Sequence, residues 1–396
     1  MDILLFCSIV ILCGFLGGRF SNWIKLPGVV GYLLVGVVLG PSVFNFAKEG
    51  FLNTVTGFND LALSIVAFII GSQLRMSMLK RMGKGIISVI LSESLAAFLI
   101  VFLGIYLLSG NLPMALLFGA MAPASAPAGT AVVLREYKAK GPLTNALYAV
   151  VGLDDGLAII IYSFSAAFAK LYLVGSQISL FTIVRGPVLE IIGSIGLGSI
   201  LALGFGYFMR KINSNREILA VSLSAIFLCA GLSNHFHFSL ILSNLTFGMV
   251  FANTFMFTSR RIVNTVDQIT VPIYIIFFVI AGAHLQVKHL LGLGLLGTVY
   301  IICRTSGLIG GSYLGAAIAR LSPTVRKYLG LGILSQAGVA IGLALLVTNE
   351  FSVLGAEGSK IAIMIINTIA ATTIVFEIIG PIATKIAISK AGEIGK

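Results

Sequence analysis

The chain has 396 residues, of which 58% are hydrophobic and only 10% are charged, and its mean hydropathy is +1.06. Because a soluble domain carries about 25% charged residues, this composition excludes an ordinary soluble protein. The formal net charge of +12 could suit nucleic acid, but the basic residues gather in short breaks between apolar runs. We therefore expect no nucleic-acid partner.

Apolar runs of roughly 17 to 30 residues alternate with short polar breaks along the whole chain, as in helices that cross a bilayer. The strict alternation of apolar and polar residues that an outer-membrane barrel needs is missing. The sequence therefore predicts an all-α polytopic membrane protein, with the lipid bilayer as its surroundings. We place about thirteen transmembrane helices at residues 3–23, 27–45, 58–74, 85–109, 112–134, 142–169, 180–209, 217–233, 239–256, 268–284, 290–319, 326–348 and 361–384.

Lys and Arg residues are divided unequally between the two sets of alternate loops. One set holds twenty of them and the other holds five, and Arg304 is left inside a span. Basic loops stay on the cytoplasmic side of a membrane. We therefore expect a multi-pass protein of the cell (inner or plasma) membrane, with its N-terminus outside and its C-terminus in the cytoplasm. The first run lacks a basic signal-peptide start, so we expect it to be a permanent helix.

Thirteen spans divide naturally into six, one and six. An odd linker helix places the second half in the membrane upside down relative to the first, which is the inverted-repeat plan of many secondary transporters. We predict one transporter unit over residues 1–396. Its first repeat covers about 1–170, the linker helix about 180–209, and the second repeat about 217–396.

The fifth and twelfth spans occupy equivalent positions in the two repeats, and both contain sequences that interrupt a helix. Pro123, Pro127 and Gly129 fall in the middle of the fifth span, where each proline removes a backbone donor and kinks or opens the helix. The twelfth span has Gln336 and Gly338 at the corresponding place. Irregular backbone is tolerated at this depth only beside packed protein or a watered cavity. We therefore predict two discontinuous helices around an ion site.

Asp154 and Asp155 lie inside an otherwise apolar span. An ionised acid at bilayer depth costs on the order of 3 kcal/mol even on a lenient scale. Two adjacent like charges in a low dielectric cannot both stay ionised without a partner. We expect this pair to bind a monovalent metal cation or protons, and Ser125 and Thr130 can supply further oxygen ligands.

Three other charged residues, Glu93, Arg304 and Glu377, fall in mid-span. In the predicted repeat, the spans of Glu93 and Arg304 are equivalent to each other, and the span of Glu377 is equivalent to that of the two aspartates. Because a guanidinium does not lose its proton in a protein, Arg304 should compensate one carboxylate. Asp154 is the first candidate partner and Glu93 the second. Glu93 and Glu377 could instead serve as interhelical hydrogen-bonding groups.

Several short motifs follow one another along the chain: Leu26-Pro27-Gly28, Leu134-Arg135-Glu136, Gly152-Leu153-Asp154-Asp155, Phe277-Phe278-Val279, Arg304-Thr305-Ser306-Gly307, Gln336-Ala337-Gly338 and Phe376-Glu377. In this order they resemble the monovalent cation–proton antiporter-2 family over essentially the whole chain. The resemblance implies a homodimer in which a dimerisation domain adjoins a mobile core of six helices, and two broken helices of the core cross near the acids. We place the core at about 58–170 and 268–385, and the dimerisation domain in the remaining helices.

The resemblance also implies roles for individual residues. The second acid of the pair, Asp155, would carry the cation and the proton in turn. Asp154 would pair with a basic residue, for which Arg304 is the candidate. The hydroxyl and backbone oxygens of Ser125-Ala126-Pro127 would help to bind the cation, although relatives often have Asp where this chain has Ala126.

We therefore predict a secondary active transporter that exchanges a monovalent cation for protons by alternating access and serves pH homeostasis. Na⁺ is the first candidate cation, and Li⁺ or K⁺ are alternatives. A Kef-like potassium/proton antiporter is a second interpretation, although such proteins carry Gln-Asp in place of Asp-Asp. A sodium-coupled symporter of an organic anion is a third, although the apolar surroundings of Asp155 offer few polar anchors. We expect no organic cofactor, and because HExxH and GxSxG motifs are missing we expect no enzyme.

Overall fold

The computed structural model describes residues 3–41, 43–46, 56–74, 76, 83–174, 180–209, 212, 214–284 and 294–395. Every regular element in these ranges is a helix, which confirms the predicted all-α class. Seven helices are long and apolar enough to cross a bilayer, and six shorter apolar helices lie between them in the chain. Each of the thirteen predicted spans contains one of these helices, so the chain is a multi-pass membrane protein.

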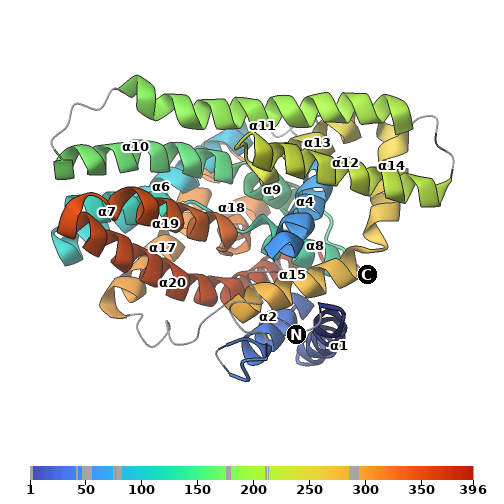
Figure 1. The fold of residues 1–396 in the computed structure, drawn as a ribbon, viewed down its shortest axis with the longest axis horizontal. Helices are drawn as coiled ribbons and strands as arrows, with labels where there is room; N and C mark the ends of the chain where they lie inside the picture. The colour runs from blue at the N-terminus through green and yellow to red at the C-terminus, as the bar shows by residue number, and fades with distance from the viewer. Residues whose placement is uncertain are drawn as a thin grey trace. The chain divides into compact units, whose positions relative to one another are not determined.

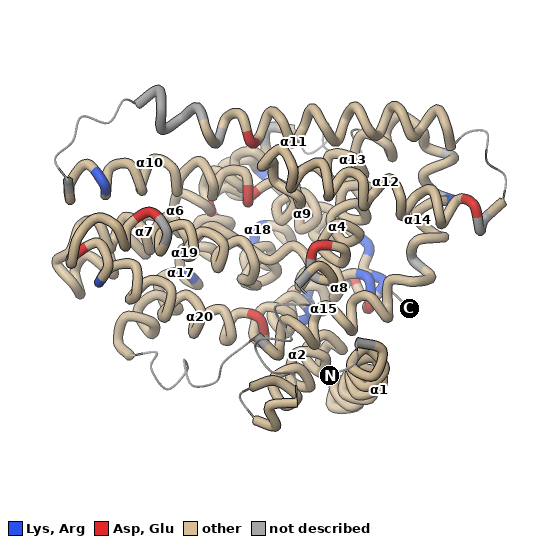
Figure 2. Tube along the Cα trace, viewed as in Figure 1, with Lys and Arg blue, Asp and Glu red and all other residues tan. Residues whose placement is uncertain are grey.

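Large apolar side chains cover the outside of these helices. Leu107, Trp23 and Ile318, for example, are 83%, 78% and 73% exposed. Charged residues are sparse along the same helices (Figure 2). Exposed apolar side chains are unfavourable in water but are suited to lipid tails, which are themselves apolar. The helix surfaces therefore match a bilayer.

The chain divides into two compact units. Figure 1 labels the helices. Unit 1 comprises Met1–Arg81 and Val188–His284, and unit 2 comprises Met82–Pro187 and Leu285–Lys396. Unit 1 contains α1 (Ile3–Trp23), α2 (Gly28–Leu39), α4 (Thr56–Gln73), most of α11 (Leu180–Met209), α12 (Asn215–His235), α13 (Leu240–Thr254), α14 (Met256–Asp267) and α15 (Thr270–His284). Unit 2 contains α6 (Lys84–Ser109), α7 (Leu112–Met121), α8 (Pro127–Glu136), α9 (Pro142–Val151), α10 (Asp154–Val174), α17 (Gly294–Ile318), α18 (Pro323–Gly332), α19 (Gly338–Phe351) and α20 (Gly355–Lys390).

Two helix pairs in unit 1 repeat one arrangement. The second span of repeat one, α2, packs on the third span of repeat two, α15; likewise α13, the second span of repeat two, packs on α4, the third span of repeat one. In both pairs glycines face the backbone of the partner helix: Gly36 and Gly282 in the first pair, and Gly71 and Gly248 in the second. This exchange of partners is what a twofold-related repeat produces.

In unit 2 the fourth spans of the two repeats, α6 and α17, pack along each other. Gly307, Gly311 and Gly315 of α17 lie on one face and form a row against α6. A Cβ atom on each would stand only 2.6 to 2.7 Å from the Cα atoms of Ala97, Glu93 and Val89, in that order. The residue numbers of the contacts decrease along α6 as they increase along α17. These equivalent helices are therefore antiparallel, as an inverted repeat requires.

The contacts group α4 and α15 with unit 1. The sequence predicts both helices, as residues 58–74 and 268–284, to belong to the mobile core. The six spans of unit 2 are the fourth to sixth of each repeat, so the compact unit around the acids is smaller than the predicted core. Which helices move together during transport stays a prediction.

The glycine row of α17 gives a test of this packing. Because small residues let membrane helices approach closely, Gly311→Ala should lower the melting temperature of the purified protein, by the equivalent of about 1–3 kcal/mol for overpacking. Gly310 has open space at its Cβ position, so Gly310→Ala serves as the matched control and should not lower it. Equal melting temperatures for the two variants would contradict the close contact.

Candidate functional site

Two helices of unit 2 are interrupted where the sequence predicted. The fifth span breaks at residues 122–126, between α7 and α8, and the twelfth breaks at residues 333–337, between α18 and α19. Pro123 lies in the first unwound segment. Pro127 begins α8, where a missing N–H costs nothing because the first turn has no acceptor for it. Gly338 likewise begins α19.

The two unwound segments cross and are joined directly. The backbone N–H of Ala126 donates a hydrogen bond to the carbonyl oxygen of Ser335 at 2.9 Å. The hydroxyl of Thr130 donates to the carbonyl oxygen of Gly332 at 2.8 Å. A Cβ atom on Gly129 would stand 3.0 Å from Ser335 Oγ, so a glycine at this position permits the close approach.

Arg304 of α17 reaches the crossing and binds the carbonyl groups that the interrupted helices leave free. Its Nε donates to Ala122 O at 2.9 Å. Its two terminal nitrogens donate to Leu334 O at 2.8 Å and to Ala124 O at 2.9 Å. The guanidinium also lies over the ring of Phe376 of α20, 4.3 Å from the ring centroid. One side chain therefore ties both unwound segments to α17.

A second polar group supports the same crossing. The side-chain amide of Gln336 donates to Met121 O at 3.1 Å and to the hydroxyl oxygen of Tyr300 at 2.9 Å. Tyr300 precedes Arg304 by one helical turn, so both side chains lie on one face of α17. We did not identify Tyr300 or Ser335 from the sequence. The four-residue spacing to Arg304 is the signal that could have pointed to Tyr300.

The sixth span is broken as well, although the sequence predicted a continuous helix over residues 142–169. A turn at Gly152 and Leu153 separates α9 from α10, although Gly152 keeps helical dihedral angles, and α10 begins with Asp154 and Asp155. Both acids therefore lie in the first turn of a helix, where the free N–H groups and the helix dipole favour negative charge. Asp154 Oδ1 accepts a hydrogen bond from the backbone N–H of Asp155 at 2.9 Å.

Several oxygen atoms around these acids are buried without a hydrogen-bond partner. They include both carboxylate oxygens of Asp155, one of Asp154 (Oδ2), and the hydroxyl of Ser125. Ser125 lies beside Asp154 and interacts with it electrostatically, but without hydrogen-bond geometry. A buried carboxylate is costly unless a proton or a cation compensates it. Oxygen ligands suit a hard cation.

The structure brings a third acid close to this pair. Glu93 of α6 is fully buried; its Oε1 accepts a hydrogen bond from Ser94 Oγ at 2.8 Å, and its Oε2 has no partner. It interacts electrostatically with Asp154 and with Arg304. Glu377 of α20 is also buried, but Arg304 has no comparable interaction with it.

Arg304 does not form a close ion pair in the described structure, where no carboxylate oxygen of Asp154 or Glu93 lies within 4.0 Å of it. Its positive charge is near both acids, while its N–H groups are bound to backbone carbonyls. In the same described part of the chain, no three or more His, Cys, Asp or Glu side chains gather as a metal-binding group. The site is therefore a small set of oxygens rather than a tight metal cage.

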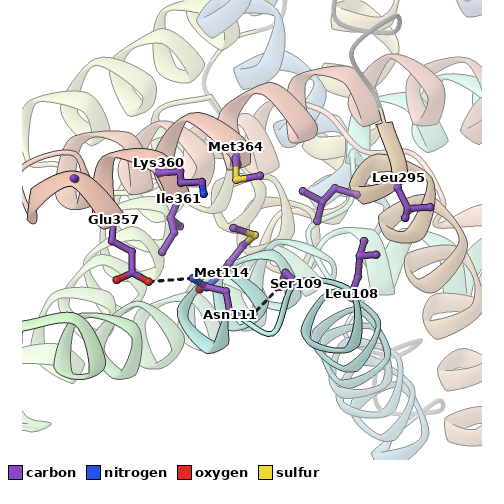
Figure 3. Close-up of a pocket in the computed structure, with 11 residues that line it drawn as sticks. Leu108, Ser109, Asn111, Met114, Leu295, Glu357, Lys360, Ile361 and Met364 are labelled. Carbon is purple, nitrogen blue, oxygen red and sulfur yellow. Dashed lines mark hydrogen bonds between the residues drawn. The ribbon is translucent and has the colours of Figure 1, made fainter.

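A separate cavity of about 700 Å³ lies where α6 ends and α7, α17 and α20 begin (Figure 3). Its polar residues include Asn111, whose side-chain amide donates to Glu357 Oε1 at 3.2 Å, and Lys360. The rest of its lining is mainly apolar, with Leu108, Leu295, Ile361 and Met364. None of the predicted site residues lines this cavity.

Arg304→Gln tests whether the guanidinium holds the crossing. Glutamine cannot reach the three carbonyl groups together, and each buried polar group left without a partner costs about 1–3 kcal/mol. We expect a strong fall in the melting temperature of the purified protein. Arg320, whose side chain is exposed, gives the control Arg320→Gln, which should melt like the wild type. An unchanged melting temperature for Arg304→Gln would show that the crossing does not need the guanidinium.

Comparisons with known proteins agree with this fold. Residues 8–387 match the family model described as "Sodium/hydrogen exchanger, transmembrane". Two solved structures of the sodium proton antiporter MjNhaP1 from Methanocaldococcus jannaschii are similar to this chain at 19% identity. The structure at pH 8 has a TM-score of 0.72 and 99% of both chains covered; the electron-microscopy structure has a TM-score of 0.76, with 100% of this chain and 97% of the other covered. The search of curated proteins gave no match.

At this identity the solved structures show the fold alone, while the family match covers nearly the whole chain. The expected membership of the cation–proton antiporters is confirmed, although the matching family is described as sodium/hydrogen exchangers and not by the antiporter-2 label. The chain belongs to the sodium/hydrogen exchanger family, and its activity is the exchange of a monovalent cation for protons.

Proposed function

We propose that this exchange takes place at Asp155, with Na⁺ as the first candidate cation. The observation that carries the proposal is that both oxygens of this carboxylate are buried without a hydrogen-bond partner, at a helix N-terminus next to another acid. A proton and a hard cation can each neutralise such a group. Because both would use the same oxygens, binding of one expels the other, and alternate exposure of the site to the two sides of the membrane gives exchange.

Asp155 is a better carrier than Asp154 for two reasons. Asp154 already accepts a backbone hydrogen bond through Oδ1, and it lies in the field of Arg304. Both features compensate part of its charge. In the described structure, the carboxylate of Asp155 has no hydrogen-bond partner, and Arg304 does not compensate its charge.

The hydrogen bonds of the crossing limit which atoms can bind the cation. The carbonyl groups of Ala122 and Ala124 are bound by Arg304, and the hydroxyl proton of Thr130 is used on Gly332. Two of the buried oxygens without a hydrogen-bond partner are Asp154 Oδ2, which is next to Asp155 in the chain, and Ser125 Oγ, which lies beside Asp154. We therefore assign ligand roles to Asp155, Asp154 and Ser125, and a supporting role to Thr130. Glu93, Arg304 and Glu377 would set the surrounding charge.

The remaining expectations belong to the same proposal. The protein would be a homodimer in the cell membrane, with its N-terminus outside and its C-terminus in the cytoplasm, and would serve pH homeostasis. It would act as a transporter without an organic cofactor and without enzymatic activity. The positive-inside distribution of Lys and Arg supports the orientation.

Asp155→Asn should abolish exchange, because an amide neither takes up a proton nor binds a cation as strongly as a carboxylate. The measurement is the collapse of an imposed proton gradient in proteoliposomes on addition of Na⁺, Li⁺ or K⁺, each tested separately. Asp60, which is exposed in α4, provides the same substitution as a control, and Asp60→Asn should exchange like the wild type. Full exchange by Asp155→Asn would refute the site, and a response to K⁺ alone would replace Na⁺ as the cation.

Direct competition also predicts the pH dependence of transport. As the pH falls, Asp155 binds a proton more often, so the cation must displace it and the apparent Km for the cation rises. If one proton is displaced, the rise is up to about tenfold per pH unit, because cation binding releases a proton. Initial rates over a range of cation concentrations at several pH values measure it. An apparent Km that does not change with pH would rule out a shared site.

A further inference from the structure

Glu393 lies just after the last helix, α20, and its carboxylate is bound to the start of another helix. The side chain is 6% exposed. Its Oε1 accepts a hydrogen bond from the backbone N–H of Leu143 at 2.8 Å. Its Oε2 accepts from the backbone N–H and from the hydroxyl of Thr144, both at 2.7 Å. All three donors belong to the first turn of α9.

These bonds do for α9 what its own sequence cannot do. The N-cap residue of α9 is Gly141, which has no side chain to accept from the free N–H groups of the first turn. Asp, Asn, Ser or Thr usually fills this role. Glu393 supplies the missing acceptor from a position about 250 residues further along the chain, and its negative charge suits the positive end of the helix dipole.

The backbone at Glu393 and just after it is bound to the same part of the chain. We call residues 391–395 the clasp. The carbonyl oxygen of Glu393 accepts from the N–H of Lys140 at 2.9 Å, and the N–H of Gly395 donates to Tyr137 O at 3.0 Å. Both partners lie in the connection between α8 and α9. The clasp therefore ties the end of α20 to α8, which follows the unwound segment 122–126, and to α9, which precedes the aspartates.

The position of α9 matters for the cation site because this helix leads directly to it. α9 spans ten residues and is followed by Gly152, Leu153 and then the two aspartates. A helix of this length is about 15 Å long and rigid, so a shift at its first turn is carried to its last. Because α9 ends at Val151 and α10 begins only at Asp154, the contacts of the first turn of α9 help to fix the position of α9.

We propose that Glu393 is a positioning residue for the cation site: it caps α9 through the clasp and so fixes where Asp154 and Asp155 stand relative to the crossing. This inference rests on the proposed site at Asp155. It concerns a role that neither the buried acids nor Arg304 fulfils.

The test uses Glu393→Gln and Thr144→Val in the purified, reconstituted protein, with Glu357→Gln as the matched control. Glu357 is at the opposite end of α20, is exposed, and accepts a single hydrogen bond from Asn111. Hydrogen–deuterium exchange of residues 141–151 measures the cap without reference to transport. We expect Glu393→Gln to exchange about fivefold faster there, the usual effect of losing a helix cap, and the control to be unchanged. Thr144→Val should have a smaller effect in the same direction, because it removes only the hydroxyl bond to Glu393.

Transport kinetics then separate positioning from simple stabilisation. Displaced ligands should raise the apparent Km for Na⁺ by about threefold or more in both variants, whereas a smaller amount of folded protein would lower only the maximal rate. The double variant should resemble Glu393→Gln alone, because the hydroxyl of Thr144 acts through the Glu393 carboxylate. Faster deuterium exchange with an unchanged Km would overturn the inference, and so would unchanged exchange of the α9 amides. Full exchange by Asp155→Asn would instead refute the proposed function.

Discussion

The fold depends most on how the carbonyl groups of two unwound segments are satisfied inside a bilayer. Lipid offers no hydrogen-bond donors, so a helix cannot open at this depth unless other groups replace the bonds that it loses. Arg304 replaces three of them at once with the fixed fork of its guanidinium. The amide of Gln336 and the backbone of Ala126 add further donors. Because of these bonds, the two segments can stay unwound at bilayer depth.

The same arrangement explains how two acids, Asp154 and Glu93, can be buried near one basic residue. Arg304 supplies positive charge near Asp154 and Glu93, yet its N–H groups are used on carbonyl oxygens. The acids are thus favoured electrostatically but are not closed off in an ion pair. A carboxylate in that condition can give up a proton to take a cation, whereas one locked to a guanidinium at hydrogen-bond distance would have to break that contact first. The charge is compensated and the ligand atoms stay available.

Much of the fold could be predicted from the sequence because lipid imposes strong rules on composition. Apolar runs gave the spans, and Pro123, Pro127 and Gly338 marked the two breaks, since proline and glycine act on the local backbone. The break at Gly152 was missed because one glycine in an apolar run does not signal it. The bonds of Arg304 were also missed: charge suggested a carboxylate partner, and a sequence cannot show which backbone carbonyls lie nearby. Glu393 escaped notice because its partners, Leu143 and Thr144, are distant in the chain.

The glycine row between α6 and α17 has a mechanical consequence. With no side chain between the two backbones, sliding one helix along the other would drive Cα atoms into each other at Gly307, Gly311 and Gly315. The two helices should therefore behave as one rigid unit that keeps Glu93 of α6 and Arg304 of α17 in a fixed relative position. We therefore expect α6 and α17 to move together when the binding site opens to the opposite side of the bilayer.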